Sequence, residues 1–99
     1  MVEEVALIGV AAGKEEAFEV AVATAAGDVF PRSSGFISLS LARCVERPNT
    51  YALKILWEKV EDHTEGFVKS ALFDEWRGLV EGILEGTPVV EHWRPVDLG

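Results

Sequence analysis

The chain has 99 residues, 48% hydrophobic and 26% charged, which leaves room for one domain with a modest core; we expect it to span residues 1–99. A net charge of −8 at pH 7 argues against nucleic acid and anionic membranes as partners, and no apolar run approaches the ~18 residues of a membrane span. The single cysteine, Cys44, excludes an internal disulfide and fits a reducing compartment, so we expect a cytoplasmic protein.

The first half of the chain predicts a strand followed by a helix. Residues 5–11 are continuously apolar and few in number, which indicates a strand buried on both faces. From Lys14 to Val29, apolar residues recur every three or four positions, which predicts a helix. Its first turns are acidic, as the helix dipole favours, and Pro31 follows its end.

The second half predicts a hairpin, a helical region and a last strand. Residues 36–46 and 51–58 alternate between two faces around an Arg-Pro-Asn turn, which indicates an antiparallel hairpin. A short helical piece is expected at residues 61–69, and a longer helix runs from its N-cap Ser70 to Gly86. With a strand at residues 89–94, the order β-α-β-β-α-β predicts an α+β, ferredoxin-like fold with a four-stranded antiparallel sheet.

Several segments, in this order and at this length, resemble one family along nearly the whole chain. They are Gly13-Lys14-Glu15-Glu16-Ala17-Phe18, Ser34-Gly35-Phe36, Pro48-Asn49-Thr50-Tyr51, Trp57-Glu58, Phe73 and Val90-Glu91-His92-Trp93. The chain resembles the antibiotic biosynthesis monooxygenase (ABM) domain family, whose members are dimeric α+β barrels. The resemblance implies a homodimer in which two sheets meet, with a pocket between each sheet and its helices.

The resemblance also implies a choice of activities. Some members oxygenate quinols or polyketide anthrones with O₂ and without metal or cofactor, others degrade heme, and another branch processes a small signalling molecule. Trp57 stands at a strand position that several of these activities share, where it would pack on a flat ring or donate its indole N–H; a core aromatic is the alternative. Arg77 stands where polyketide oxygenases have an arginine that would stabilise a phenolate or peroxide anion; pairing with Glu81 is the alternative.

Other positions depart from the branches of the family. Leu53 replaces an amide of the polyketide oxygenases and cannot hydrogen-bond a substrate oxygen. Ala6 and Phe67 stand where heme-degrading members have Asn and His, so heme is not the expected cofactor. His63 would ligate iron only in a shifted register; it is also a candidate general base, although a surface histidine near the helix start is the simpler interpretation.

These residues define the predicted site and leave its function open. The predicted catalytic residues are Trp57 and Arg77, and the predicted substrate-binding residues are Ala6, Ile8, Leu53, His63, Phe67 and Phe73. His92 is expected at a dimer contact or on the surface, and no metal or cofactor is expected. We expect a cofactor-independent monooxygenase acting with O₂ on a small electron-rich aromatic. A non-catalytic dimeric ligand-binding or accessory protein is the main alternative, followed by heme binding or degradation and signal-molecule processing.

Overall fold

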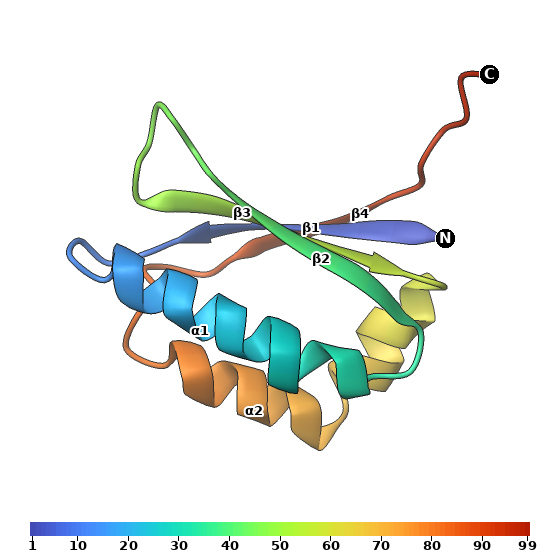
Figure 1. Ribbon diagram of the computed structural model, residues 1–99, viewed down its shortest axis with the longest axis horizontal. Coiled ribbons are helices and arrows are strands. Elements are labelled where there is room, and N and C mark those ends of the chain that lie inside the picture. Colours follow the sequence, from blue (N-terminus) through green and yellow to red (C-terminus); the bar gives the residue numbers. More distant parts are fainter.

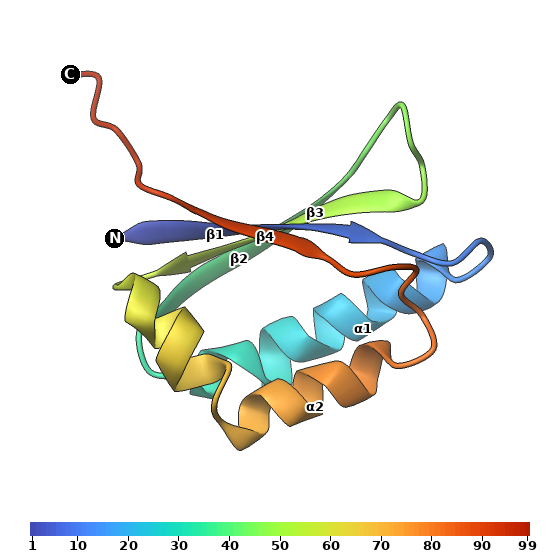
Figure 2. The same ribbon diagram turned by 180° about the vertical axis from the view of Figure 1, so that it is seen from behind.

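A computed structural model describes all 99 residues as two layers, a four-stranded antiparallel sheet with the helices on one face (Figure 1 and Figure 2). The strands are β1 (Val2–Gly9), β2 (Phe36–Arg43), β3 (Thr50–Trp57) and β4 (Val89–Trp93), arranged β2-β3-β1-β4. The helices are α1 (Glu15–Asp28) and α2 (Ala71–Val80), with a 3-10 turn η1 (Phe30–Arg32) and a π-helical turn η2 (Asp62–Phe67). The predicted α+β ferredoxin-like fold is confirmed.

Neither α1 nor α2 has the length and apolar character that a membrane crossing requires.

The core lies between the sheet and the helices. Alternate residues of β1 and β3 point inward and are almost completely buried: Ala6, Ile8, Tyr51, Leu53, Ile55 and Trp57. The face of α1 packed against them presents Phe18, Ala21, Val22 and Ala25. Since a slip of one residue would turn all of these strand side chains to solvent, their burial fixes the register of the sheet.

The opposite face of the sheet is open, which corrects the prediction that the first strand is buried on both faces. Leu7 is 42% exposed, and its register partner Val89 on β4 is 57% exposed. The reason is that both helices cover the same face, while the chain after β4 runs away from the sheet on the other side (Figure 2). Within one chain, only alternate residues of β1 are therefore buried.

The second helix is shorter than predicted. It ends at Val80 instead of Gly86, because Glu81 leaves helical geometry with ψ 130° and Gly82 takes a positive φ of 77°. The following residues bond to the end of β1: Ala11 N–H donates to Ile83 O, and Glu85 N–H donates to Gly9 O, both at 2.9 Å. Ile83 and Leu84 pack against the core although they lie outside the helix. Their apolar spacing therefore resembled that of a continued helix in the sequence.

Candidate functional site

A cavity of about 290 Å³ lies between the sheet and α2. Ten of its fourteen lining residues are hydrophobic, including the aromatic side chains of Phe30, Phe67, Phe73 and Trp76. Seven of the eight site residues predicted from the sequence line it: Ala6, Ile8, Leu53, His63, Phe67, Phe73 and Arg77. The strand alternation and the helix spacing thus bring these residues together as expected.

Trp57, the eighth predicted residue, does not line the cavity. Its side chain is completely buried at the end of β3, where its ring stacks on His63 with centroids 5.6 Å apart. The indole Nε1–H donates a 3.0 Å hydrogen bond to Oε1 of Glu4. Trp57 therefore positions a carboxyl group that faces the cavity.

Glu4 is the titratable residue of the cavity lining that sequence reasoning missed. It lies on β1, is only 6% exposed, and lines the cavity beside Ala6. Burial raises the pKa of its carboxyl group from 4.5 to about 7, although the hydrogen bond from Trp57 opposes this shift. Strand alternation was the available signal, because Glu4, Ala6 and Ile8 occupy every second position of one strand.

His63 is buried, which corrects the expectation of a surface histidine. The wide turn of η2, closed by a 3.0 Å bond from Val68 N–H to His63 O, directs the imidazole under the sheet, where it is 8% exposed. Burial, followed by repulsion from His92, lowers the pKa of His63 from 6.5 to about 4. At neutral pH His63 is uncharged, and Glu4 is the stronger base of the two.

His92 joins this cluster from the edge strand. In the β1–β4 register it stands opposite Glu4, so it lies on the helix side of the sheet although it is exposed. Its Nε2 atom is 2.8 Å from Nδ1 of His63, and Nε2 of His63 is 3.3 Å from Oε1 of Glu4. The three side chains form a connected row from the buried cavity to the surface.

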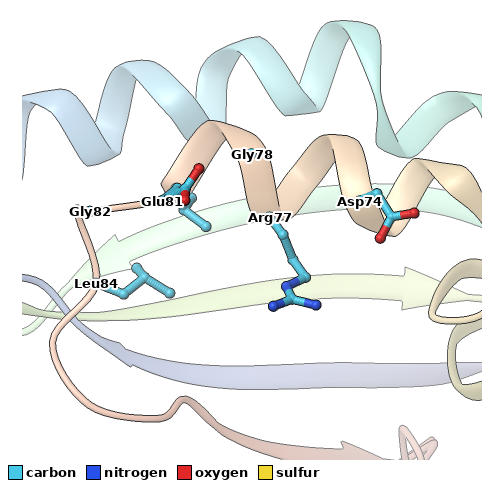
Figure 3. A pocket seen from close by; sticks show the side chains of 7 residues that line it. Asp74, Arg77, Gly78, Glu81, Gly82 and Leu84 are labelled. Atoms are coloured by element: carbon cyan, nitrogen blue, oxygen red, sulfur yellow. The ribbon is translucent and has the colours of Figure 1, made fainter.

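Arg77 lies where the cavity meets a larger groove of about 480 Å³ along the end of α2. Figure 3 shows its side chain extending from α2 over the strands, away from Asp74 and Glu81. The alternative pairing with Glu81 is absent from the ion pairs of the chain. The guanidinium carbon instead lies 5.8 Å from the centre of the Phe73 ring, so its charge is available to a bound anion.

The residue set does not favour a metal site. No group of three His, Cys, Asp or Glu side chains has the arrangement that holds a metal ion. Both ring nitrogens of His63 face a partner, Glu4 on one side and His92 on the other, so neither is directed toward an iron in the cavity.

Comparison with known proteins establishes the family. Residues 1–79 match the family described as antibiotic biosynthesis monooxygenase. The chain is a member of this ABM family. Among curated proteins, the uncharacterized protein YczJ of Bacillus subtilis (strain 168) is 38% identical over 96 residues, which are 97% of this chain and 100% of YczJ. The resemblance predicted from the sequence is confirmed.

Solved structures agree with this assignment. A crystal structure from Bordetella bronchiseptica, itself provisionally assigned as an antibiotic biosynthesis monooxygenase, is 39% identical, with a TM-score of 0.93 and 96% of each chain covered. A variant of SnoaB, a cofactor-independent oxygenase from Streptomyces nogalater, is 20% identical with a TM-score of 0.74, covering 97% of this chain and 93% of that one. At this lower identity, the second similarity shows that the ABM fold is shared.

Proposed function

We propose that this ABM protein is a cofactor-independent monooxygenase that uses O₂ to oxidise a small electron-rich aromatic of the quinol or polyketide type. The observation that carries the proposal is Glu4, a carboxyl group buried at an apolar cavity with a pKa of about 7. Such a group acts as a base near neutral pH, and activation of this kind of substrate begins with loss of a proton.

The cavity supports a flat apolar substrate of modest size. Its volume of about 290 Å³ lies just below the roughly 300–1,000 Å³ typical of ligand sites, which favours a compact ring system. Phe67, Phe73 and Trp76 offer aromatic surfaces for packing. Glu4 supplies a polar contact that Leu53, with its aliphatic side chain, does not.

Each residue has a defined part in the proposed reaction. The free oxygen of Glu4, Oε2, has no partner within the chain and is not sealed off, so it takes a proton from the substrate. The resulting ring anion is electron-rich enough to react with O₂, and Arg77 stabilises the phenolate or peroxide anion. For an anthrone-type carbon, a CH₂ group becomes C=O; its two protons leave with the second oxygen atom as water, so no external reductant is needed.

Oxygen uptake with anthrone and with menadiol tests this function. We expect turnover by the wild-type protein and a loss of roughly 10²-fold or more in kcat for Glu4→Gln, because the amide cannot act as a base. Arg77→Ala is expected to slow turnover, and Trp57→Phe to slow it by releasing Glu4. Glu16→Gln, an exposed carboxylate on α1, and Arg47→Ala, an exposed arginine after β2, are the matched controls.

Two results would contradict the proposal. One is uptake by Glu4→Gln at the wild-type rate. The other is binding of both compounds in the cavity without any oxygen uptake, which would favour the non-catalytic ligand-binding alternative. The apolar lining of the cavity supports that alternative equally well, whereas the raised pKa of the buried Glu4 carboxyl group favours the enzyme.

A further inference from the structure

The row Glu4–His63–His92 connects the buried cavity to the solvent-exposed surface of β4. Glu4 and His63 are 6% and 8% exposed, whereas His92 lies exposed on β4. Nδ1 of His63 is 2.8 Å from Nε2 of His92, and Nε2 of His63 is 3.3 Å from Oε1 of Glu4. The first distance is that of a hydrogen bond, and the second is that of two groups in contact, which must turn toward each other for a proton to pass between them.

A neutral imidazole in this position has two arrangements. It carries one proton, so one nitrogen donates while the other accepts. With the proton on Nδ1, His63 donates to His92 and accepts at Nε2 from a protonated Glu4. With the proton on Nε2, His63 donates to a Glu4 carboxylate and accepts at Nδ1 from His92. The state of each end of the row thus fixes the state of the other.

We infer that Glu4, His63 and His92 hold one proton in common, and that His92 is a positioning residue that sets the ionisation of the cavity base from the protein surface. The exchange balances. The Glu4 O–H bond and the His63 Nδ1–H bond break, while N–H bonds form at His63 Nε2 and at His92 Nε2. Glu4 becomes a carboxylate, His92 becomes an imidazolium, and His63 is uncharged in both states.

The surroundings suit such an exchange. Burial disfavours a charge on His63, and the row moves a proton past it without creating one. The cavity lining contains one other charged side chain, Arg77 on α2. Trp57 Nε1–H from β3 donates to Glu4 Oε1 and favours the carboxylate form of Glu4. No other titratable side chain lines the cavity.

This inference deepens the proposed function, because control of the base matters for catalysis only if Glu4 is one. The coupling itself is measurable without turnover. Side-chain NMR of the ¹³C-carboxyl of Glu4 and the ¹⁵N-imidazoles of both histidines, followed against pH, is the direct test. We expect Glu4 and His92 to titrate with the same two apparent midpoints, and both tautomers of His63 to be populated near pH 7.

Variants at His92 sharpen the test. In His92→Phe, Glu4 should titrate in a single step whose midpoint is raised by about 1 pH unit, because the imidazolium that favours the carboxylate is gone. His92→Gln keeps a donor and an acceptor but cannot titrate, so Glu4 should again show one step. Glu91→Gln, next along β4 and on the other face of the sheet, is the matched control and should keep both steps.

The outcomes separate the two proposals. An unchanged Glu4 curve in His92→Phe, or a single His63 tautomer near pH 7 in the wild type, would overturn the shared proton. If Glu4 and His92 titrate together while the protein consumes no O₂ with anthrone or menadiol, the inference stands and the proposed function fails. If the protein is active, the pH–rate profile of His92→Phe should move by the same shift as its Glu4 midpoint.

Discussion

Glu4 and His63 make opposite contributions to stability as the pH changes. Folding raises the pKa of Glu4 from 4.5 to about 7, so between these values the native state binds more protons than the unfolded state, and the free energy of unfolding falls as pH rises. Folding lowers the pKa of His63 from 6.5 to about 4, so over that range the native state binds fewer protons and the free energy rises. In the wild type the two effects largely cancel.

Substituting either Glu4 or His63 should reveal the pH-dependent contribution that the other residue makes to stability. Relative to wild type, the free energy of unfolding of Glu4→Gln should rise by up to about 3 kcal/mol from pH 4.5 to 7, since the opposing contribution is gone. The free energy of unfolding of His63→Gln should fall relative to wild type by a similar amount from pH 4 to 6.5, because the contribution that rises with pH is gone. Urea unfolding at several pH values measures both differences, with Glu16→Gln as control. Curves that run parallel to wild type would contradict the burial of these groups.

The same two residues show where sequence reasoning ends. Ala6, Leu53 and Phe67 could be assigned to the cavity because strand alternation and helical spacing decide which way a side chain points. Alternation also places Glu4 on this face, but the predicted strand began at residue 5, one position after Glu4, and the side chains that hold its carboxyl group, Trp57 and His63, lie far along the chain. An acidic residue at the start of a strand gives no sign of such partners. The burial of His63 likewise follows from a π-helical turn, for which composition gives little signal.

At the scale of elements, the order and type of strands and helices were predictable, whereas the end of α2 was not. Apolar residues from Leu72 to Leu84 keep helical spacing, and the sequence contains three glycines that could end the helix, Gly78, Gly82 and Gly86. The helix ends before Gly82 because backbone groups of Ile83 and Glu85 bond to the end of β1. Those bonds depend on tertiary contact, which local spacing does not reveal.

Two glycines of this region give a matched prediction. Gly78 lies within α2 with nothing close to its missing Cβ, so Gly78→Ala should stabilise the protein by roughly 1 kcal/mol. Gly82 also has free space, but its φ of +77° is left-handed, so Gly82→Ala should destabilise by roughly 1–2 kcal/mol. Chemical denaturation of the two variants tests the boundary. Stabilisation by both substitutions would show that the helix continues past Val80.

At the scale of the whole molecule, the open face of the sheet carries apolar side chains that no other element of the chain covers. Three of its apolar side chains are largely exposed: Leu7 at 42%, Val89 at 57% and Trp93 at 56%. Val5 and Leu56 lie on the same face and are half-buried. Lys54 and Glu91 stand on either side of Val5 in the strand register, so charged side chains lie among the apolar ones. Exposed apolar side chains of this kind mark an interface, and two such faces packed together bury them. This supports the homodimer that the resemblance implies.

Leu7→Lys and Trp93→Glu should therefore convert a wild-type dimer to monomers, because each places a charge on the face where the two sheets would pack. Sedimentation velocity measures the change, and Val20→Lys is the matched control, since Val20 is 60% exposed on α1, away from this face. A dimer that survives both sheet substitutions, or is lost in Val20→Lys, would contradict the sheet-to-sheet arrangement. The residues that line the cavity lie on the helix side of the sheet, opposite the face where the sheets would pack, so the monomeric variants should keep the raised pKa of Glu4 while losing the dimer.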